Sequence, residues 1–173
     1  YQCFRGNGKV WFIEQDMDTE LYLPDAAFHF IFSIFSAYYS NNPKSLFGYC
    51  KNCLGEDGTL VLIGPTERNS WEVDDFCFQL YGQTSASADR AKRLESEFIP
   101  LLKSLELLVT SERISFDLTF PDSDQYLKYL TSTLQFRESY NGQLDRDLSK
   151  NIIVEKYKKT LTKEIVCLRA KRI

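Results

Sequence analysis

Polar and aromatic side chains follow three apolar segments in the first part of this sequence, at Asp16-Met17, at residues 33–39 and at residues 64–69. If these segments are parallel strands, their carboxyl ends meet at one rim of a sheet, where loops gather polar groups above a rigid floor. The run from residue 10 to residue 66 is typical of the middle of a nucleotide-binding α/β domain. The sequence therefore predicts a ligand site at this rim.

Two other patterns could do chemistry elsewhere. Cys50 and Cys53 have the spacing of a redox motif or of half a zinc site. No second Cys or His pair stands at ligand spacing, and the two cysteines fall late in a predicted helix, so we predict no metal site. His29, the single histidine, has the chemistry of a general base, but its place at the amino end of a strand favours a packed or capping role. No catalytic residue can be assigned from the sequence.

Apolar runs and turn signals indicate the elements that position the rim. Residues 10–13 form a short buried run. Residues 28–35 are too rich in aromatic and branched side chains for a one-sided surface strand, so we expect a central strand there. Pro43 opens a helix over residues 43–54. Residues 59–63 form a third buried strand.

Apolar strands that alternate with helices predict a doubly wound α/β fold, with a parallel sheet covered on both faces. No linker divides the chain, so we expect a single domain. The later elements are predicted at residues 70–80, 88–108 and 123–134 for helices and at residues 113–120 and 164–170 for strands.

The composition is typical of one soluble domain, with 173 residues of which 43% are hydrophobic and 26% charged. The formal net charge of −3 and the pI of about 5.3 make nucleic acid an unlikely partner. Five cysteines, an odd number, do not resemble a disulfide framework and favour a reducing, cytoplasmic location. No apolar stretch reaches the roughly 20 residues that span a bilayer, so no membrane contact is predicted. We also expect that Tyr1 is not a native start, since neither Met nor a signal peptide opens the sequence.

The segment FIEQDMDTELYLPDAAFHFIFSIFSAYY, followed by a helix, by LGEDGTLVLIGPTERNSWE and by a late FPDSDQYLKYLTST, resembles the class I S-adenosylmethionine-dependent methyltransferases. The likeness covers nearly the whole chain from Val10 onward. It implies a three-layer Rossmann-like sheet, mostly parallel with an antiparallel C-terminal strand pair. Residues 1–66 would form the cofactor side of one partial domain, and residues 67–173 its substrate side.

The resemblance also implies site residues. In that family an Asp after the third strand accepts a hydrogen bond from the adenine amino group, and the next residue faces the ring. The residues implied for S-adenosylmethionine are Asp16 and Met17 at the adenine and Ser33, Ile34 and Phe35 at the methionine side. The candidates for binding the acceptor, or for an aromatic wall that accommodates a cation, are Tyr38, Tyr39, Asn69 and Trp71, with core packing as their alternative role.

Two features depart from the family pattern. Phe28-His29 stands where the family commonly has Phe-Asp. The first two strands, with the glycine-rich loop and the acidic residue that holds the ribose, find no match. Such a gap would leave backbone groups of apolar strands unpaired. An upstream segment, a second polypeptide, or direct pairing of residues 10–13 with residues 28–35 would repair it, and the first is the simplest.

The function that follows is methyl transfer from S-adenosylmethionine by part of a longer or two-part enzyme. A small-molecule acceptor is expected, because nothing basic surrounds the rim. The cofactor supplies the reactive group, while the protein orients the acceptor and excludes water. The alternative is a non-catalytic methyltransferase-like module that binds or activates a partner through its open strand edge. A nicotinamide-dependent dehydrogenase would need a first-strand fingerprint that is lacking.

Overall fold

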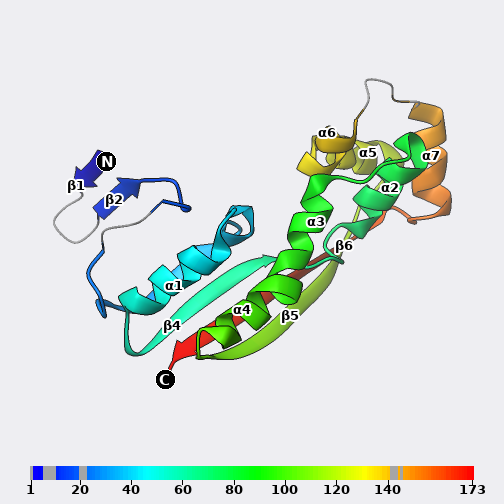
Figure 1. Cartoon of the computed structure of the whole chain (residues 1–173). Coiled ribbons are helices and arrows are strands. Elements are labelled where there is room, and N and C mark those ends of the chain that lie inside the picture. Colours follow the sequence, from blue (N-terminus) through cyan, green and yellow to red (C-terminus); the bar gives the residue numbers. More distant parts are fainter. Residues whose placement is uncertain (1, 6–10, 20–22, 141–143, 145) are drawn as a thin grey trace.

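The computed structural model describes residues 2–5, 11–19, 23–140, 144 and 146–173 (Figure 1). Its elements in chain order are β1 (Gln2–Arg5), β2 (Trp11–Glu14), β3 (Phe28–Ile34), a 3-10 turn (Ala37–Tyr39), α1 (Pro43–Cys53), β4 (Leu54–Pro65), α2 (Trp71–Tyr81), α3 (Ala86–Arg93), a π-helical turn (Leu94–Phe98), α4 (Ile99–Ser104), β5 (Leu107–Thr119), α5 (Ser123–Ser132), α6 (Leu134–Ser139), α7 (Arg146–Glu155) and β6 (Thr160–Arg172).

The main sheet has four strands in the order β3-β4-β6-β5. β3 runs parallel to β4, whereas β6 lies antiparallel to both of its neighbours. The mixed α/β class and the antiparallel C-terminal strand pair are thereby confirmed. One of the three described strand pairings in this sheet is parallel, so parallel pairing does not predominate in the described part of the chain.

The N-terminal strands bear on the gap that the sequence leaves in the sheet. β2 pairs antiparallel with β1 in a separate two-stranded sheet and does not join β3. Of the three repairs that the sequence leaves open, direct pairing of residues 10–13 with residues 28–35 is therefore not found among the described residues, and Val10 lies outside them. The prediction that β3 is central is wrong, because β3 forms the edge of the four-stranded sheet. Its apolar residues indicate burial on both faces, but helices cover only one face in the part of the chain that the structure describes.

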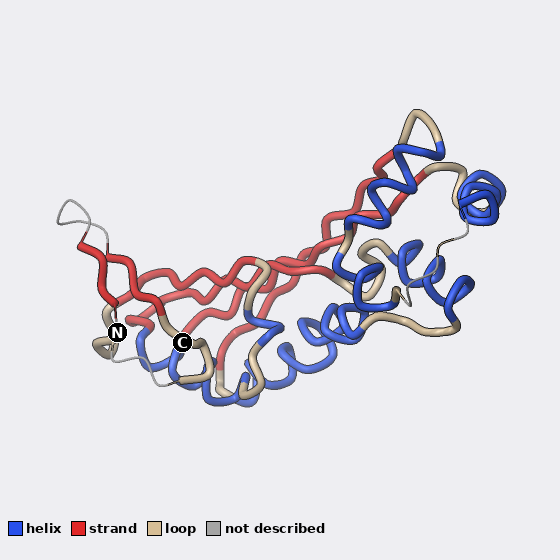
Figure 2. Tube along the Cα trace, turned by 90° about the horizontal axis from the view of Figure 1, so that it is seen from above, coloured by secondary structure: helices blue, strands red, loops and turns tan. Residues whose placement is uncertain are grey.

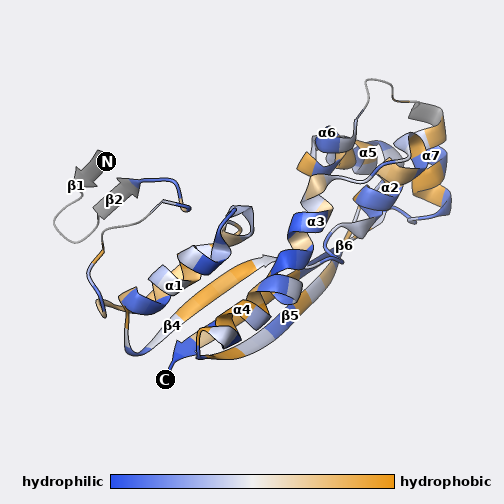
Figure 3. Ribbon diagram, in the orientation of Figure 1, coloured by the Kyte–Doolittle hydropathy of each residue, from blue (hydrophilic) through white to orange (hydrophobic). Residues whose placement is uncertain are grey.

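The first hydrophobic core lies between that covered face and the helices that follow β3 and β4. Leu60 and Leu62 of β4 and Leu168 of β6 pack against Phe47 of α1 and Phe98 of the π-helical turn. Figure 2 shows the helices beside β3 and β4 on one side of the sheet, and Figure 3 shows the apolar character of β4. α1 begins as predicted, because Asn42 accepts a hydrogen bond from the Ser45 amide and Pro43 occupies the first turn.

The long helix predicted over residues 88–108 is present as a continuous helical path through α3, the π-helical turn and α4, and it ends at Ser104. Pro100 cannot donate a hydrogen bond to the preceding turn and crowds its carbonyl, which accounts for a widened turn at this point. Glu106, at φ 60°, then reverses the chain into β5.

A second hydrophobic core lies at the other end of β5 and β6, where α2, α5, α6 and α7 gather (Figure 1). Tyr126 and Leu130 of α5, Phe76 of α2, Ile153 of α7 and Leu161 of β6 are buried there. α7 had no counterpart among the sequence predictions. The helices of this second core place α6 beside α2 and α3, and so close one wall of the site described next.

Candidate functional site

A cavity of about 150 Å³ opens at the carboxyl ends of the parallel strands β3 and β4. It lies between the loop after β3, the end of β4, α3 and the start of α6. The residues that line it are Phe35, Tyr38, Tyr39, Pro65, Asn69, Ser87, Arg90, Ala91, Leu134 and Gln135. The carboxyl rim of the sheet is thus hollowed where the sequence predicts a ligand site.

Four predicted site residues meet at this cavity: Phe35, Tyr38, Tyr39 and Asn69. Tyr38 and Tyr39 have ring centroids 4.6 Å apart. Burial, with a contribution from Tyr39, raises the pKa of the Tyr38 hydroxyl to about 12. The Tyr38 hydroxyl therefore keeps its proton near neutral pH and is not a base there. Trp71 does not line the cavity; it is 42% exposed and packs edge-on against Tyr157, with ring centroids 6.2 Å apart.

The residues predicted for the cofactor are spread more widely. Asp16 is exposed, and its Oδ1 accepts a hydrogen bond of 2.9 Å from the Asp18 amide. Met17 lines a second hollow, of about 380 Å³, against α1. Ser33 holds the turn after β3, since its hydroxyl lies 2.7 Å from that of Ser36 and accepts a hydrogen bond of 3.0 Å from the Ala37 amide. Ile34 is 57% exposed and Phe35 lines the cavity.

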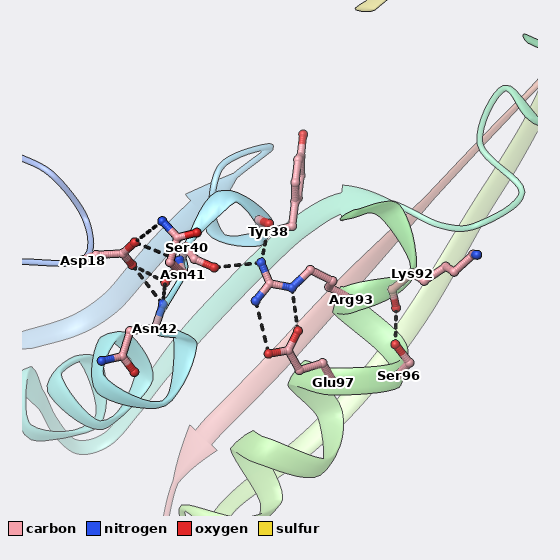
Figure 4. A network of polar contacts seen from close by, with 9 residues as sticks. All are labelled: Asp18, Tyr38, Ser40, Asn41, Asn42, Lys92, Arg93, Ser96 and Glu97. Carbon is pink, nitrogen blue, oxygen red and sulfur yellow. Dashed lines mark hydrogen bonds and ion pairs between the residues drawn. The ribbon is translucent and has the colours of Figure 1, made fainter. Parts of the chain in front are cut away.

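Asp18 joins the acidic turn to the loop after β3, a contact that the sequence did not reveal (Figure 4). Its carboxylate accepts hydrogen bonds from the Ser40 hydroxyl, the Asn41 amide at 2.8 Å, the Asn41 side chain at 3.0 Å and the Asn42 amide at 3.3 Å. These bonds, that from Ser40 first, lower the pKa of Asp18. Asp18 thereby fixes the acidic turn beside the carboxyl end of β3. Asp16 lies on the exposed side of the same turn.

Arg93 of α3 holds the same loop from the opposite side (Figure 4). Its Nη1 donates to the carbonyl oxygens of Tyr38 and Ser40, at 2.7 Å each. Glu97 pairs with the other nitrogens at 2.5 and 3.1 Å and raises the pKa of Arg93. The signal in the sequence was an Arg and a Glu four residues apart on a predicted helix, but only the packing shows that they face a loop 53 to 55 residues away.

Replacing Arg93 with methionine should loosen the loop that carries Tyr38 and Tyr39. The Tyr39 and Ser40 amides, which donate to Ser36 and Ala37 at 3.0 Å, should exchange with solvent faster. The free energy of unfolding should fall by about 1 to 3 kcal/mol, the usual loss for hydrogen bonds made by a charged group. Hydrogen exchange and urea unfolding would measure both effects.

Lys92 provides the control for that experiment, because it lies on the same helix in an exposed ion pair with Asp89. Lys92→Met removes the same charge and should leave exchange in the loop unchanged. Equal exchange rates in the wild type and in Arg93→Met would show that Arg93 does not hold the loop.

Cys50, Cys53 and His29 are not among the residues that line the cavity. Burial, with a contribution from Cys53, raises the pKa of the Cys50 thiol to about 12. A thiol in that state is a poor nucleophile and a poor metal ligand near neutral pH. Within the described residues no group of three or more His, Cys, Asp or Glu side chains could hold a metal ion. His29 is exposed near the amino end of β3.

No model of a protein family matches the sequence, and no curated protein is significantly similar to it. Solved structures do resemble it in fold. A candidate methyltransferase from Bacillus halodurans has a TM-score of 0.54 and 15% identity, over 92% of this chain and 76% of that protein. The YcgJ protein from Bacillus subtilis has a TM-score of 0.52 and 12% identity, over 91% and 69%.

A third structure is that of an S-adenosylmethionine-dependent methyltransferase from Thermotoga maritima, a candidate histamine N-methyltransferase. Its TM-score is 0.50 at 11% identity, and the match covers 93% of this chain and 63% of that protein. Among the described helices, none is both long and apolar enough to cross a membrane. At such low identity the likeness concerns the fold alone, and the chain has the fold of the class I S-adenosylmethionine-dependent methyltransferases.

Proposed function

We propose that this chain forms the acceptor side, and part of the cofactor side, of an S-adenosylmethionine-dependent methyltransferase that acts on a small molecule. The observation that carries the proposal is the cavity at the carboxyl ends of β3 and β4, in a chain with the methyltransferase fold. Pockets for drug-sized ligands have volumes of about 300 Å³ or more. The volume of this cavity, about 150 Å³, is half of that. It supports a small acceptor.

The described residues fit one part of the cofactor. One carboxylate oxygen of Asp16 accepts from the Asp18 amide, and the other, without a hydrogen bond from the described residues, could accept from an adenine amino group. Phe35, which directly follows β3, would face the methionine side. The cavity is too small to enclose the whole cofactor, so further polypeptide is proposed to complete its site. When bound, S-adenosylmethionine would supply the methyl group.

The chain's own residues would orient the acceptor and exclude water. Asp18 and Arg93 fix the loop that carries Tyr38 and Tyr39, so that the aromatic wall is formed before a ligand arrives. This arrangement supports positioning rather than proton transfer as the contribution of the protein. A location in the cytoplasm remains a prediction.

Calorimetric titration with S-adenosylmethionine and S-adenosylhomocysteine tests the proposal. The folded chain should bind both, and Asp16→Ala should weaken binding by about tenfold, the factor for one hydrogen bond to a charged group. Asp117→Ala, a change of an exposed carboxylate on β5, serves as the control. A folded chain that binds neither compound, alone or together with a polypeptide that completes the sheet, would speak against a cofactor site in this chain.

A second candidate function is a non-catalytic module that binds or activates a partner. The observation that favours it is the edge of β3, which has no partner strand among the described residues and lies next to exposed Phe30, Phe32 and Ile34. An upstream segment or a second chain that completes the sheet would serve either function. Recovery of cofactor binding on addition of such a polypeptide would favour the enzyme over the module.

A further inference from the structure

The acceptor cavity has hydrogen-bond donors that no neighbouring group uses. Arg90 is the charged residue among the described residues that line it. Its Nη2 donates to Glu138 at 2.5 Å and to the Ser87 hydroxyl at 2.8 Å. Its Nε has no partner but is buried from solvent, whereas Nη1 makes no hydrogen bond within the described part of the chain and is the donor left for a ligand. A guanidinium with unused donors can bind a planar oxyanion.

Asn69 supplies a second unused donor. Its Oδ1 accepts a hydrogen bond of 3.3 Å from the Glu164 amide. Because a backbone amide can only donate, the atom facing Glu164 must be the oxygen, and this fixes the orientation of the side chain. The Nδ2 group therefore points elsewhere and has no partner among the residues that the structure describes. Since Asn69 lines the cavity, this donor is available to a ligand.

The aromatic wall of the cavity is poorly suited to a cation. The Arg90 guanidinium carbon lies 5.3 Å from the centre of the Tyr39 ring. The ring therefore already has a cationic partner, and a second cation beside it would be repelled by Arg90. A protonated amine finds neither a free aromatic face at Tyr39 nor a carboxylate among the lining residues.

The charge of Arg90 is in turn partly balanced by Glu138, whose Oε1 lies 2.5 Å from Nη2. A dianion such as a phosphate ester would meet repulsion from Glu138, whereas a singly charged carboxylate meets less repulsion and can accept a hydrogen bond from the unused Nη1 of Arg90. Phe35, Leu134 and the tyrosine rings leave an apolar wall for the body of the ligand.

We propose that the cavity binds an acceptor through a carboxylate held by Arg90 and Asn69, with a small apolar or aromatic body against the tyrosines. The proposal rests on the proposed function and names its substrate class: small organic acids. It is tested without the cofactor, so that its failure differs from a failure to bind S-adenosylhomocysteine.

Ligand-observed NMR with three matched probes tests the proposal: phenylacetate, phenylacetamide and phenethylamine share one skeleton and differ in charge. The folded wild type should bind phenylacetate most tightly and phenethylamine least. Arg90→Met should weaken phenylacetate binding by about tenfold to a hundredfold, the factor for a lost charge-assisted hydrogen bond. Lys92→Met, on the same helix but in an exposed pair with Asp89, should not.

Asn69→Asp keeps the test decisive if Arg90→Met fails to fold. The change preserves shape and the bond from the Glu164 amide, and it replaces the free donor with a charged oxygen. Phenylacetate binding should be lost and phenethylamine binding should rise. The proposal is overturned if the folded wild type does not bind phenylacetate, if it binds phenethylamine as tightly, or if Asn69→Asp leaves phenylacetate binding unchanged.

Discussion

Replacing Phe30 and Phe32 together with lysine should prevent the association that we expect of this chain and should leave it folded. Both phenylalanines are 61% exposed and Ile34 is 57% exposed, on alternate positions of β3. Their rings stack, with centroids 6.0 Å apart. The strand pairs with β4 along one edge, and its other edge has no partner strand in the described sheet. An apolar strand with an open edge is a template for pairing with another chain.

Sedimentation velocity over a range of concentrations would measure the effect. The wild type should form larger species as its concentration rises, whereas the double lysine variant should stay monomeric. Because both side chains are exposed, the free energy of unfolding should change by less than about 0.5 kcal/mol. Phe78→Lys, which alters a phenylalanine 56% exposed on α2, is the control and should associate like the wild type. Equal association of all three proteins would show that β3 is not the contact.

The outcome bears on both candidate functions, since a polypeptide that completes the sheet would bind at this place. On β4, Val61 and Ile63 stand next to Phe32 and Ile34 in the register and extend the apolar face inward. A helix laid across these residues would bury them together, and a strand along β3 would pair its free backbone groups. Lysines at Phe30 and Phe32 should therefore also block any such partner.

Local signals predicted the elements well where they act within a few residues. Pro43 at the first turn placed the helix over residues 43–54, and the structure has α1 at Pro43–Cys53. The apolar residues of β3 likewise predicted a strand at residues 28–35, close to the observed Phe28–Ile34. Its edge position was missed, because an apolar sequence indicates a need for burial and does not tell which other segment satisfies it.

Long-range pairing limited the remaining predictions. The strand expected at residues 164–170 begins at Thr160, where polar residues gave no apolar signal and pairing with β5 decides the conformation. At the site, the acidic turn was recognised, but Asp18 rather than Asp16 reaches the loop after β3. The role of Arg90 depends on the packing of α3 against the loop with Tyr39, about 50 residues earlier in the chain. The spacing of apolar residues in the sequence cannot reveal such a contact.

Replacing Phe98 with alanine should produce the largest loss of stability that we predict. Phe98 is fully buried, and its ring meets that of Phe47 edge-on with centroids 4.8 Å apart. Truncating a buried phenylalanine costs about 3 to 5 kcal/mol. Since a domain of this kind is stable by about 5 to 15 kcal/mol, the variant should lie close to its unfolding threshold at ordinary temperatures. Urea unfolding followed by circular dichroism would measure the loss.

In Phe98→Ala, the loop that carries Tyr38 and Tyr39 should lose its order before the whole chain unfolds, because Phe98 packs against Arg93, which holds that loop. The Arg93 guanidinium carbon lies 5.4 Å from the Phe98 ring, and Arg93 in turn holds the carbonyls of Tyr38 and Ser40. Phe98→Leu, which leaves a smaller void, should lose less than half as much stability and keep the loop ordered. Phe136→Ala in the second core separates the two effects, since it should cost similar stability without disturbing the loop. If both alanine variants loosen the loop equally, the two cores unfold as one unit and Phe98 has no special role beneath the site.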